Sequence, residues 1–250
     1  MKKILAIGVA VILTAIFVFS AWQLGRYFIE NAEAQNQFDR IIGQVRQTPP
    51  LLLGQFDTEL PVWTPYDQYG ELFAQNPDMI GWIAIDGTAI NYPVMQTPDR
   101  PNFYLHRNFE GRRCKFGVPY IFEYASIDPQ SHNITIFGHN MRNDRMFGSL
   151  RNFRCADFLR EHPIIRFDTR AGFGEYEIFA VFTVQPQHFD YHLFVDAGNE
   201  AEFYRFVQRV RELSLHDTNV IVTYGDRLIT LSTCEYSRPN NRLVVVARKV

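Results

Sequence analysis

The sequence is poor in cysteine, in net charge and in long apolar segments. Its 3 cysteines, Cys114, Cys155 and Cys234, include no CxxC pair, which excludes a disulfide-rich scaffold and a zinc knuckle and leaves at least one thiol unpaired. The 25 Lys and Arg residues against 27 Asp and Glu residues leave a formal charge of −2, too balanced for a protein that binds nucleic-acid phosphates. No nucleic-acid partner is therefore predicted. A single apolar segment is long enough to cross a bilayer, which excludes a multi-span transporter.

That apolar segment lies at the N-terminus. Ile4 to Gly25 contains no charged residue and is about long enough for one helix to cross a ~30 Å hydrocarbon layer. Lys2 and Lys3 precede it, and positive charges stay on the cytoplasmic side of a membrane. The sequence therefore predicts a single-pass anchor in the cell membrane through residues 4–25, with the remainder extracellular. The alternative is a cleaved signal peptide with its site at residues 32–34, although the apolar run exceeds the usual ~7–15 residue core of such a peptide.

The region after the anchor contains one amphipathic segment. From residue 26 to 47 the chain is polar except for a stripe of large apolar side chains at the i, i+3, i+4, i+7 spacing of a helix. These side chains are costly to leave in water, so the helix is expected to dock on the folded domain. Residues 48–78 are predicted to form an irregular connector. The expected organisation is an anchor at 1–25, amphipathic helix and connector at 26–78, and a folded domain at 79–250. The stripe consists of Phe38, Ile41, Ile42 and Val45.

Beyond Met79 the sequence is dominated by short strand signals. Two of these runs, 79–85 and 89–94, flank Asp86-Gly87-Thr88, a glycine-containing turn typical of a hairpin. Many short strands without regular strand–helix alternation favour a mostly β fold, an antiparallel or mixed β-barrel with a few helices, over a doubly wound α/β sheet. Further strands are predicted at 117–123, 133–137, 164–168, 175–184, 227–233 and 242–248, and helices near 146–151, 156–160 and 199–213.

Two of the cysteines are candidate nucleophiles. Cys234 ends a β-rich run, where the sheet fixes the backbone while the thiol can face a cleft. Cys114 lies between two basic residues, whose charges favour a thiolate, so it is the rival on electrostatic grounds. Cys155 precedes a predicted helix and is expected to fill the core. Free cysteines are commonly buried apolar residues, so position alone leaves a non-catalytic role for Cys234 open.

A cysteine nucleophile needs a proton-transfer partner and a group that stabilises the developing oxyanion. Among the 7 histidines, His139 is the best placed, because it follows a β-rich run and precedes a polar turn. Arg242 begins the strand after Cys234, so it reaches the same end of the sheet if the two strands are adjacent. A lone histidine or arginine is more commonly structural. His188 and His192 form a pair without an evident third ligand, so no metal site is predicted.

Together these residues and their neighbours resemble the sortases, and among them class B. The resemblance rests on Thr230-Leu231-Ser232-Thr233-Cys234, which matches the family's TLxTC motif, on Gly138-His139-Asn140-Met141, and on Arg242 at a family-like spacing after the cysteine. It extends over most of the chain after Met79, including the segment 90–94 and the long helix before the cysteine strand, which is a class B feature. Phe137 differs, because many relatives carry a tyrosine two residues before the histidine.

The resemblance implies a sortase-like β-barrel and a cysteine transpeptidase on the outer face of a Gram-positive membrane. Cys234 would cleave a C-terminal sorting signal similar to NPxTN or LPxTG after its threonine and form a thioacyl-enzyme. His139 would transfer the protons, and Arg242 would hold the oxyanion and the peptide. An amine of a peptidoglycan precursor or a pilin lysine would accept the acyl group, and no cofactor is needed because the thioester conserves the acyl bond energy. The expected substrate-binding residues are Asn91, Ser232 and Glu235.

Other classes of protein share parts of this pattern. A cysteine protease or amidase would use the same Cys–His pair to hydrolyse a cell-surface peptide. An L,D-transpeptidase keeps its histidine close to its cysteine in sequence, whereas His139 lies far from Cys234. A non-catalytic, membrane-tethered binding module would bury Cys234 in its core, and the thiol would then resist alkylation.

Overall fold

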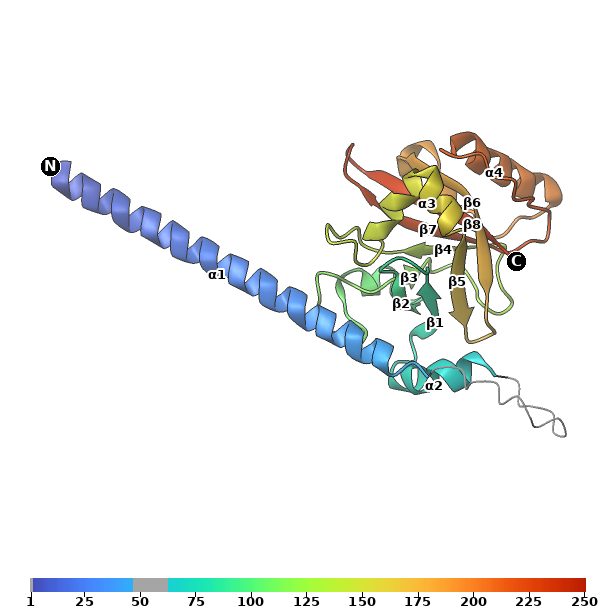
Figure 1. Cartoon of the computed structure of the whole chain (residues 1–250), viewed down its shortest axis with the longest axis horizontal. Coiled ribbons are helices and arrows are strands. Elements are labelled where there is room, and N and C mark those ends of the chain that lie inside the picture. The colour runs from blue at the N-terminus through green and yellow to red at the C-terminus, as the bar shows by residue number, and fades with distance from the viewer. Residues whose placement is uncertain (1, 47–62) are drawn as a thin grey trace. The chain divides into compact units, whose positions relative to one another are not determined.

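The computed structural model describes residues 2–46 and 63–250, which fall into two units (Figure 1). The first unit, Met1–Ile41, is formed by helix α1 (Lys2–Gly43), whose last residues belong to the second unit. The second unit, Ile42–Val250, contains a closed β-barrel. The expected boundaries, an anchor at 1–25, a helix and connector at 26–78 and a folded domain from Met79, stay a prediction.

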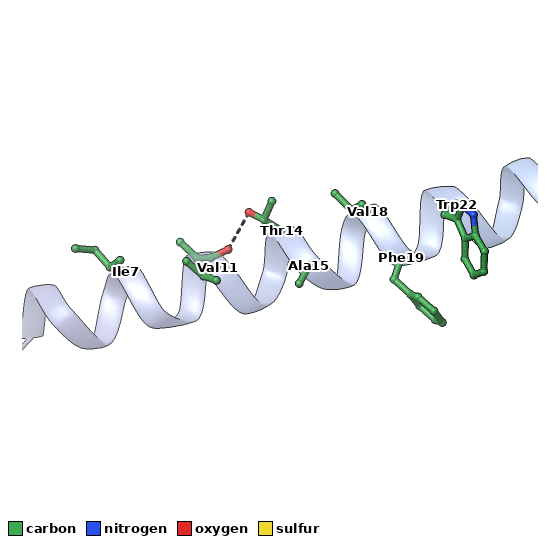
Figure 2. Close-up of a pocket in the computed structure, with 8 residues that line it drawn as sticks. Ile7, Val11, Thr14, Ala15, Val18, Phe19 and Trp22 are labelled. Carbon is green, nitrogen blue, oxygen red and sulfur yellow. Dashed lines mark hydrogen bonds between the residues drawn. The ribbon is translucent and has the colours of Figure 1, made fainter.

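Helix α1 is long and apolar enough to cross a membrane, with a mean hydropathy of 2.1 in its apolar part. The Thr14 hydroxyl donates to the Ala10 carbonyl at 2.9 Å, so this polar group is satisfied without water (Figure 2). The structure differs from the expectation in one respect: the apolar and amphipathic segments form one continuous helix, because no proline interrupts residues 2–43. Docking of the amphipathic stripe stays a prediction. Figure 2 shows the apolar side chains that flank Thr14: Ile7, Val11, Ala15, Val18, Phe19 and Trp22.

Part of the expected connector is a helix. Residues 48–62 lie outside the described residues, but α2 (Pro65–Gln75) contradicts an irregular structure for the rest. Proline at its first position and the Asp67 carboxylate, which accepts from the Thr64 amide at 2.9 Å, start this helix. Tyr69 attaches it to the barrel by stacking on Trp82 and donating to the Asp168 carboxylate at 2.7 Å.

The barrel is mixed, as predicted, and closes in the strand order β1-β2-β3-β4-β7-β8-β6-β5. The pairs β2·β3 and β4·β7 are parallel, and the other neighbouring pairs are antiparallel. β4 and β7 come from distant parts of the chain, so their pairing joins the two segments that carry the predicted site. The strands are β1 (Met79–Ala84), β2 (Asn91–Met95), β3 (Tyr120–Ile121), β4 (Asn133–Phe137), β5 (Ile164–Thr169), β6 (Glu175–Val184), β7 (Leu228–Glu235) and β8 (Asn241–Lys249).

The remaining helices cover or connect the strands. The apolar face of α4 packs against β6, and the Asn199 side chain caps its first turn by accepting from the Glu202 amide at 3.0 Å (Figure 1). The helix expected near 146–151 is instead a 3-10 helix, displaced toward the C-terminus. These helices are η1 (Phe103–His106), η2 (Gly148–Arg154), α3 (Ala156–Glu161), η3 (Pro186–His188), η4 (Tyr191–Leu193) and α4 (Glu200–Leu213).

Candidate active site

Strands β4, β7 and β8 carry the predicted catalytic residues to one edge of the barrel. β4 and β7 are parallel, with Phe137 opposite Ser232, so the residues after β4 emerge beside the end of β7. β8 is antiparallel to β7 and starts at this edge, with Arg242 directly opposite Cys234. Side chains of directly opposed residues project from the same face, with Cβ atoms about 4.5–5.5 Å apart. The predicted adjacency of the two strands is confirmed, and it places the Cys234 thiol and the Arg242 guanidinium on one face.

The turn after β4 is tied to β7 on both sides of His139. The amide of Gly138 donates to the Ser232 carbonyl at 3.1 Å, and its carbonyl accepts from the Thr233 hydroxyl at 2.7 Å. On the other side, the Asn140 side-chain amide donates to the carbonyl of Cys234 itself at 2.7 Å. The His139 backbone is therefore held next to that of Cys234.

The imidazole of His139 is half-buried and held in one tautomer. Its Nε2 lies 2.7 Å from the Leu105 carbonyl oxygen, which can only accept, so Nε2 carries the hydrogen and Nδ1 keeps the lone pair for proton transfer. Burial lowers the pKa of His139, the hydrogen bond to Leu105 acts in the opposite direction, and the nearby His106 lowers it further. The site thus favours a neutral imidazole that can accept a proton at Nδ1.

The charge of Arg242 acts on the hydroxyl groups of three tyrosines. Burial raises the pKa of Tyr120, Tyr191 and Tyr236, and the charge of Arg242 acts in the opposite direction on all three. Nη1 of Arg242 donates to the Asn241 carbonyl at 3.2 Å, and within residues 2–46 and 63–250 no carboxylate forms an ion pair with it. Arg242 lies on the same face as the Cys234 thiol, and no carboxylate among the described residues neutralises its charge. It is therefore suited to stabilise the oxyanion that forms when this thiol attacks a carbonyl group.

Aromatic rings line the same edge of the barrel. The Phe137 ring lies 5.5 Å from that of Tyr120 and 6.3 Å from those of Phe122 and His192. Phe137 therefore packs inside an aromatic group and supplies no hydroxyl there. Tyr191, next to His192, donates to or accepts from the Ser232 hydroxyl at 2.6 Å, which joins this group to β7.

Comparison with known proteins identifies the family, because residues 83–250 match the model of the sortase domain. The chain belongs to the sortases, in class B. It is 29% identical to sortase B of Listeria monocytogenes over 251 residues, which cover 100% of this chain and 98% of that protein. It is 27% identical to sortase B of Staphylococcus aureus over 250 residues, which cover 99% of this chain and 97% of that protein.

Solved sortase structures confirm the fold. The Staphylococcus aureus sortase B–substrate complex superposes with a TM-score of 0.68 at 31% identity, covering 73% of this chain and 84% of that chain. Sortase B of Bacillus anthracis in complex with AAEK1 superposes with a TM-score of 0.75 at 29% identity, covering 89% of this chain and 99% of that one. The predicted class, the sortase-like barrel and the activity of a cysteine transpeptidase are therefore confirmed.

In this sortase the three residues predicted to bind substrate have contacts within the fold. The Asn91 side chain accepts from Trp82 Nε1 at 2.7 Å, at the end of β2 remote from its pairing with β3. Ser232 is buried and bonded to Tyr191, and Glu235 accepts from the Asn241 side-chain amide at 2.7 Å. The contacts of Ser232 and Glu235 support the edge of the barrel that carries the site, whereas that of Asn91 lies at the other end of β2. A role of Asn91, Ser232 and Glu235 in binding substrate stays a prediction.

All three cysteines are free thiols. The expectation that Cys155 fills the core is wrong: it is exposed, because it occupies the capping position before α3. Cys114 is half-buried on the loop after η1, where its amide donates to the His106 carbonyl at 2.9 Å. Cys114 lies outside the described strands, so strand pairing does not place it opposite an arginine as it places Cys234 opposite Arg242.

Sequence reasoning did not find the contribution of η1. Leu105 binds the predicted catalytic imidazole and His106 stacks on it, with ring centroids 5.5 Å apart. The contact of Leu105 uses a backbone carbonyl, for which a single sequence carries no signal. His106 was one of the unassigned histidines, and only the folded chain brings it beside His139.

Proposed function

We propose that this sortase attaches surface proteins to the cell wall, with Cys234 as its nucleophile. The Cys234 sulfur attacks the threonine carbonyl carbon of a C-terminal sorting signal similar to NPxTN or LPxTG. The peptide bond after threonine breaks, the new amine leaves with a proton, and a thioester joins the threonine carbonyl to Cys234. The observation that supports this assignment is the position of Cys234 opposite Arg242, at the edge where His139 leaves β4.

In this proposal His139 transfers the protons through Nδ1. The neutral ring accepts the Cys234 thiol proton at Nδ1 as the sulfur attacks, and it passes this proton to the leaving amine. It then accepts a proton from the incoming amine and returns it to the Cys234 sulfur when the thioester breaks. Because Nε2 is held by Leu105, the same nitrogen serves both steps without rotation of the ring. Arg242 holds the oxyanion of each tetrahedral intermediate.

The acceptor amine belongs to a peptidoglycan precursor or to a pilin lysine in this proposal. Helix α1 serves as a single-pass anchor, with Lys2 and Lys3 on the cytoplasmic side and the barrel outside. Anchoring confines the enzyme, the sorting signal and a lipid-linked acceptor to one surface, which raises their effective concentration.

The test uses the full-length protein in detergent with an NPxTN-like or LPxTG-like peptide, with and without an added amine. We expect an amide product that requires the amine, no product with Cys234→Ala, and nearly full activity with the control Cys114→Ala. Peptide cleavage at the same rate with and without the amine, with no amide product, would indicate a hydrolase. Loss of activity in Cys114→Ala with retention in Cys234→Ala would reverse the assignment of the nucleophile.

A further inference from the structure

The 3-10 helix η1 contacts the His139 ring through two consecutive residues. The Leu105 carbonyl accepts from Nε2 at 2.7 Å, and the His106 imidazole lies against that of His139 with ring centroids 5.5 Å apart and planes inclined by 29°. The proposed function uses the first contact to fix the tautomer. It leaves the second imidazole without a role.

Buried polar contacts hold η1 in place. The Tyr104 side chain is buried in η1, and its hydroxyl donates to the Asp78 carboxylate at 2.9 Å and accepts from the Asn76 side-chain amide at 2.9 Å. Burial raises the pKa of Tyr104 to about 12, so this hydroxyl stays protonated and keeps both hydrogen bonds. The position of η1 is therefore set by the core and does not depend on its exposed side chains.

The loop after η1 fixes the backbone of the two contact residues. Gly117, with φ +58°, lies so close that a Cβ atom there would be 2.5 Å from the Leu105 carbonyl oxygen. The Cys114 amide donates to the His106 carbonyl at 2.9 Å. His106 thus combines a fixed backbone with a ring that is exposed to solvent and faces another imidazole.

We propose that His106 is a positioning residue for His139: its ring supports one face of the His139 ring, and a positive charge on the His106 ring opposes protonation of His139. This inference rests on the proposed role of His139 in proton transfer. A charge on the nearby His106 ring lowers the pKa of His139. His106 therefore helps keep His139 neutral, with the Nδ1 lone pair available.

The distance and the exposure of His106 set the strength of this effect. At a ring-centroid separation of 5.5 Å the charge of His106 acts directly on the His139 ring and lowers its pKa. Because the His106 side chain is exposed, solvent partly screens this charge.

The charged and titratable groups on the neighbouring elements do not change when His106 is replaced. They are Arg107, Arg113 and Cys114 after η1, Cys234 at the end of β7, Arg242 on β8, and Arg142 and Tyr236 on the adjoining turns.

The test compares the wild-type full-length protein in detergent with His106→Phe and His106→Gln. The phenyl ring keeps the aromatic contact without a charge, whereas the glutamine side chain removes both. The ¹³Cε1 resonances of labelled histidines are followed by NMR as the pH is changed. We expect the pKa of His139 to rise in both variants, because both remove the charge that His106 can carry. A titration of His139 that is unchanged in both variants would overturn the proposal.

The matched control is His188→Phe. His188 is also an exposed histidine in a 3-10 helix, η3, so it tests the same substitution away from the stacked pair. This variant should leave the titration of His139 unchanged. A shift as large as that of His106→Phe would show that the effect is not specific to the stacked ring.

Activity measurements separate this inference from the proposed function. With His106→Phe, the pH–rate profile of amide formation should move to higher pH by the shift that NMR measures for His139. A shift in the NMR titration with an unmoved rate profile would show that the rings are coupled but that His139 does not transfer the protons. Such a result would count against the proposed function and leave the electrostatic coupling intact.

Discussion

Replacement of Thr233 by valine removes one hydrogen bond that links the nucleophile strand to the turn carrying His139. The Thr233 hydroxyl donates to the Gly138 carbonyl at 2.7 Å, and Thr233 is only 2% exposed. Valine has nearly the same shape, so the main loss is the donor, and a carbonyl left without its partner costs about 1–3 kcal/mol. In a chain of this size, each kcal/mol lowers the Tm by about 2–4 °C.

This loss should also affect catalysis, because Gly138 directly precedes His139. A displacement of a catalytic group by about 1 Å can reduce the rate by about 100-fold, so we expect kcat/KM for amide formation to fall about 10- to 100-fold in Thr233→Val. The matched control is Thr230→Val. Thr230 is 0% exposed and donates to the Asn133 side chain at 2.8 Å, about 10 Å farther along the same strand.

The two variants should lose similar stability and differ in activity. Thermal unfolding monitored by circular dichroism gives the first quantity, and the transfer assay with a sorting peptide gives the second. Thr230→Val should retain wild-type kcat/KM at a temperature where both variants are folded. Equal losses of activity in the two variants, or an unchanged rate in Thr233→Val, would refute the argument that this hydrogen bond positions His139.

Three further predictions follow from the contacts of the site and of α2. Arg242→Lys keeps the charge but loses the planar guanidinium, so kcat should fall about 100-fold with an unchanged circular dichroism spectrum; retained kcat would remove Arg242 from the oxyanion role. Burial lowers the pKa of His139, so the folded state resists protonation and stability is lost as the pH falls below the ordinary imidazole value of 6.5. Urea unfolding at about pH 7.5 and about pH 5.5 should therefore show a smaller loss in His139→Gln than in the wild type, and equal losses would contradict the assignment. Tyr69→Phe removes the donor to the Asp168 carboxylate and should reduce the free energy of unfolding by about 1–3 kcal/mol; an unchanged urea midpoint would show that this contact does not stabilise α2 on the barrel.

Much of the site could be predicted because its signals are local. The strand before Cys234 and the strand that starts at Arg242 are separated by a short polar turn, so their antiparallel pairing follows from proximity in sequence. Asn240, with φ +57°, adopts the left-handed conformation that such a turn uses. Cys234 and Arg242 lie opposite each other because this hairpin pairs the two strands.

The position of His139 relative to Cys234 is not a local property. It depends on the parallel pairing of β4 with β7, which sequence periodicity cannot assign, because alternation identifies a strand and not its neighbour. The resemblance to a known family supplied this link. The tautomer of His139 depends in addition on the Leu105 carbonyl, which any residue would provide.

The errors outside the site also have physical causes. The start of α2 has a proline and a capping carboxylate, which are typical of a helix. The neighbouring sequence is rich in turn-forming residues, however, so the segment was predicted to be irregular. The strand predicted at 117–123 is reduced to β3, because Gly117 turns the chain against η1 and only Tyr120 and Ile121 pair with β4. The first deviation arises from conflicting local signals, and the second from a tertiary contact that local propensity does not include.

The identity of the acylated residue tests the central claim most directly. The full-length protein would be incubated with a sorting peptide without an amine acceptor, quenched in acid, digested and analysed by mass spectrometry. The account predicts the acyl fragment ending in threonine on Cys234, removable by hydroxylamine and absent from Cys234→Ala. An adduct on Cys114 or Cys155, or amide formation by Cys234→Ala, would contradict it.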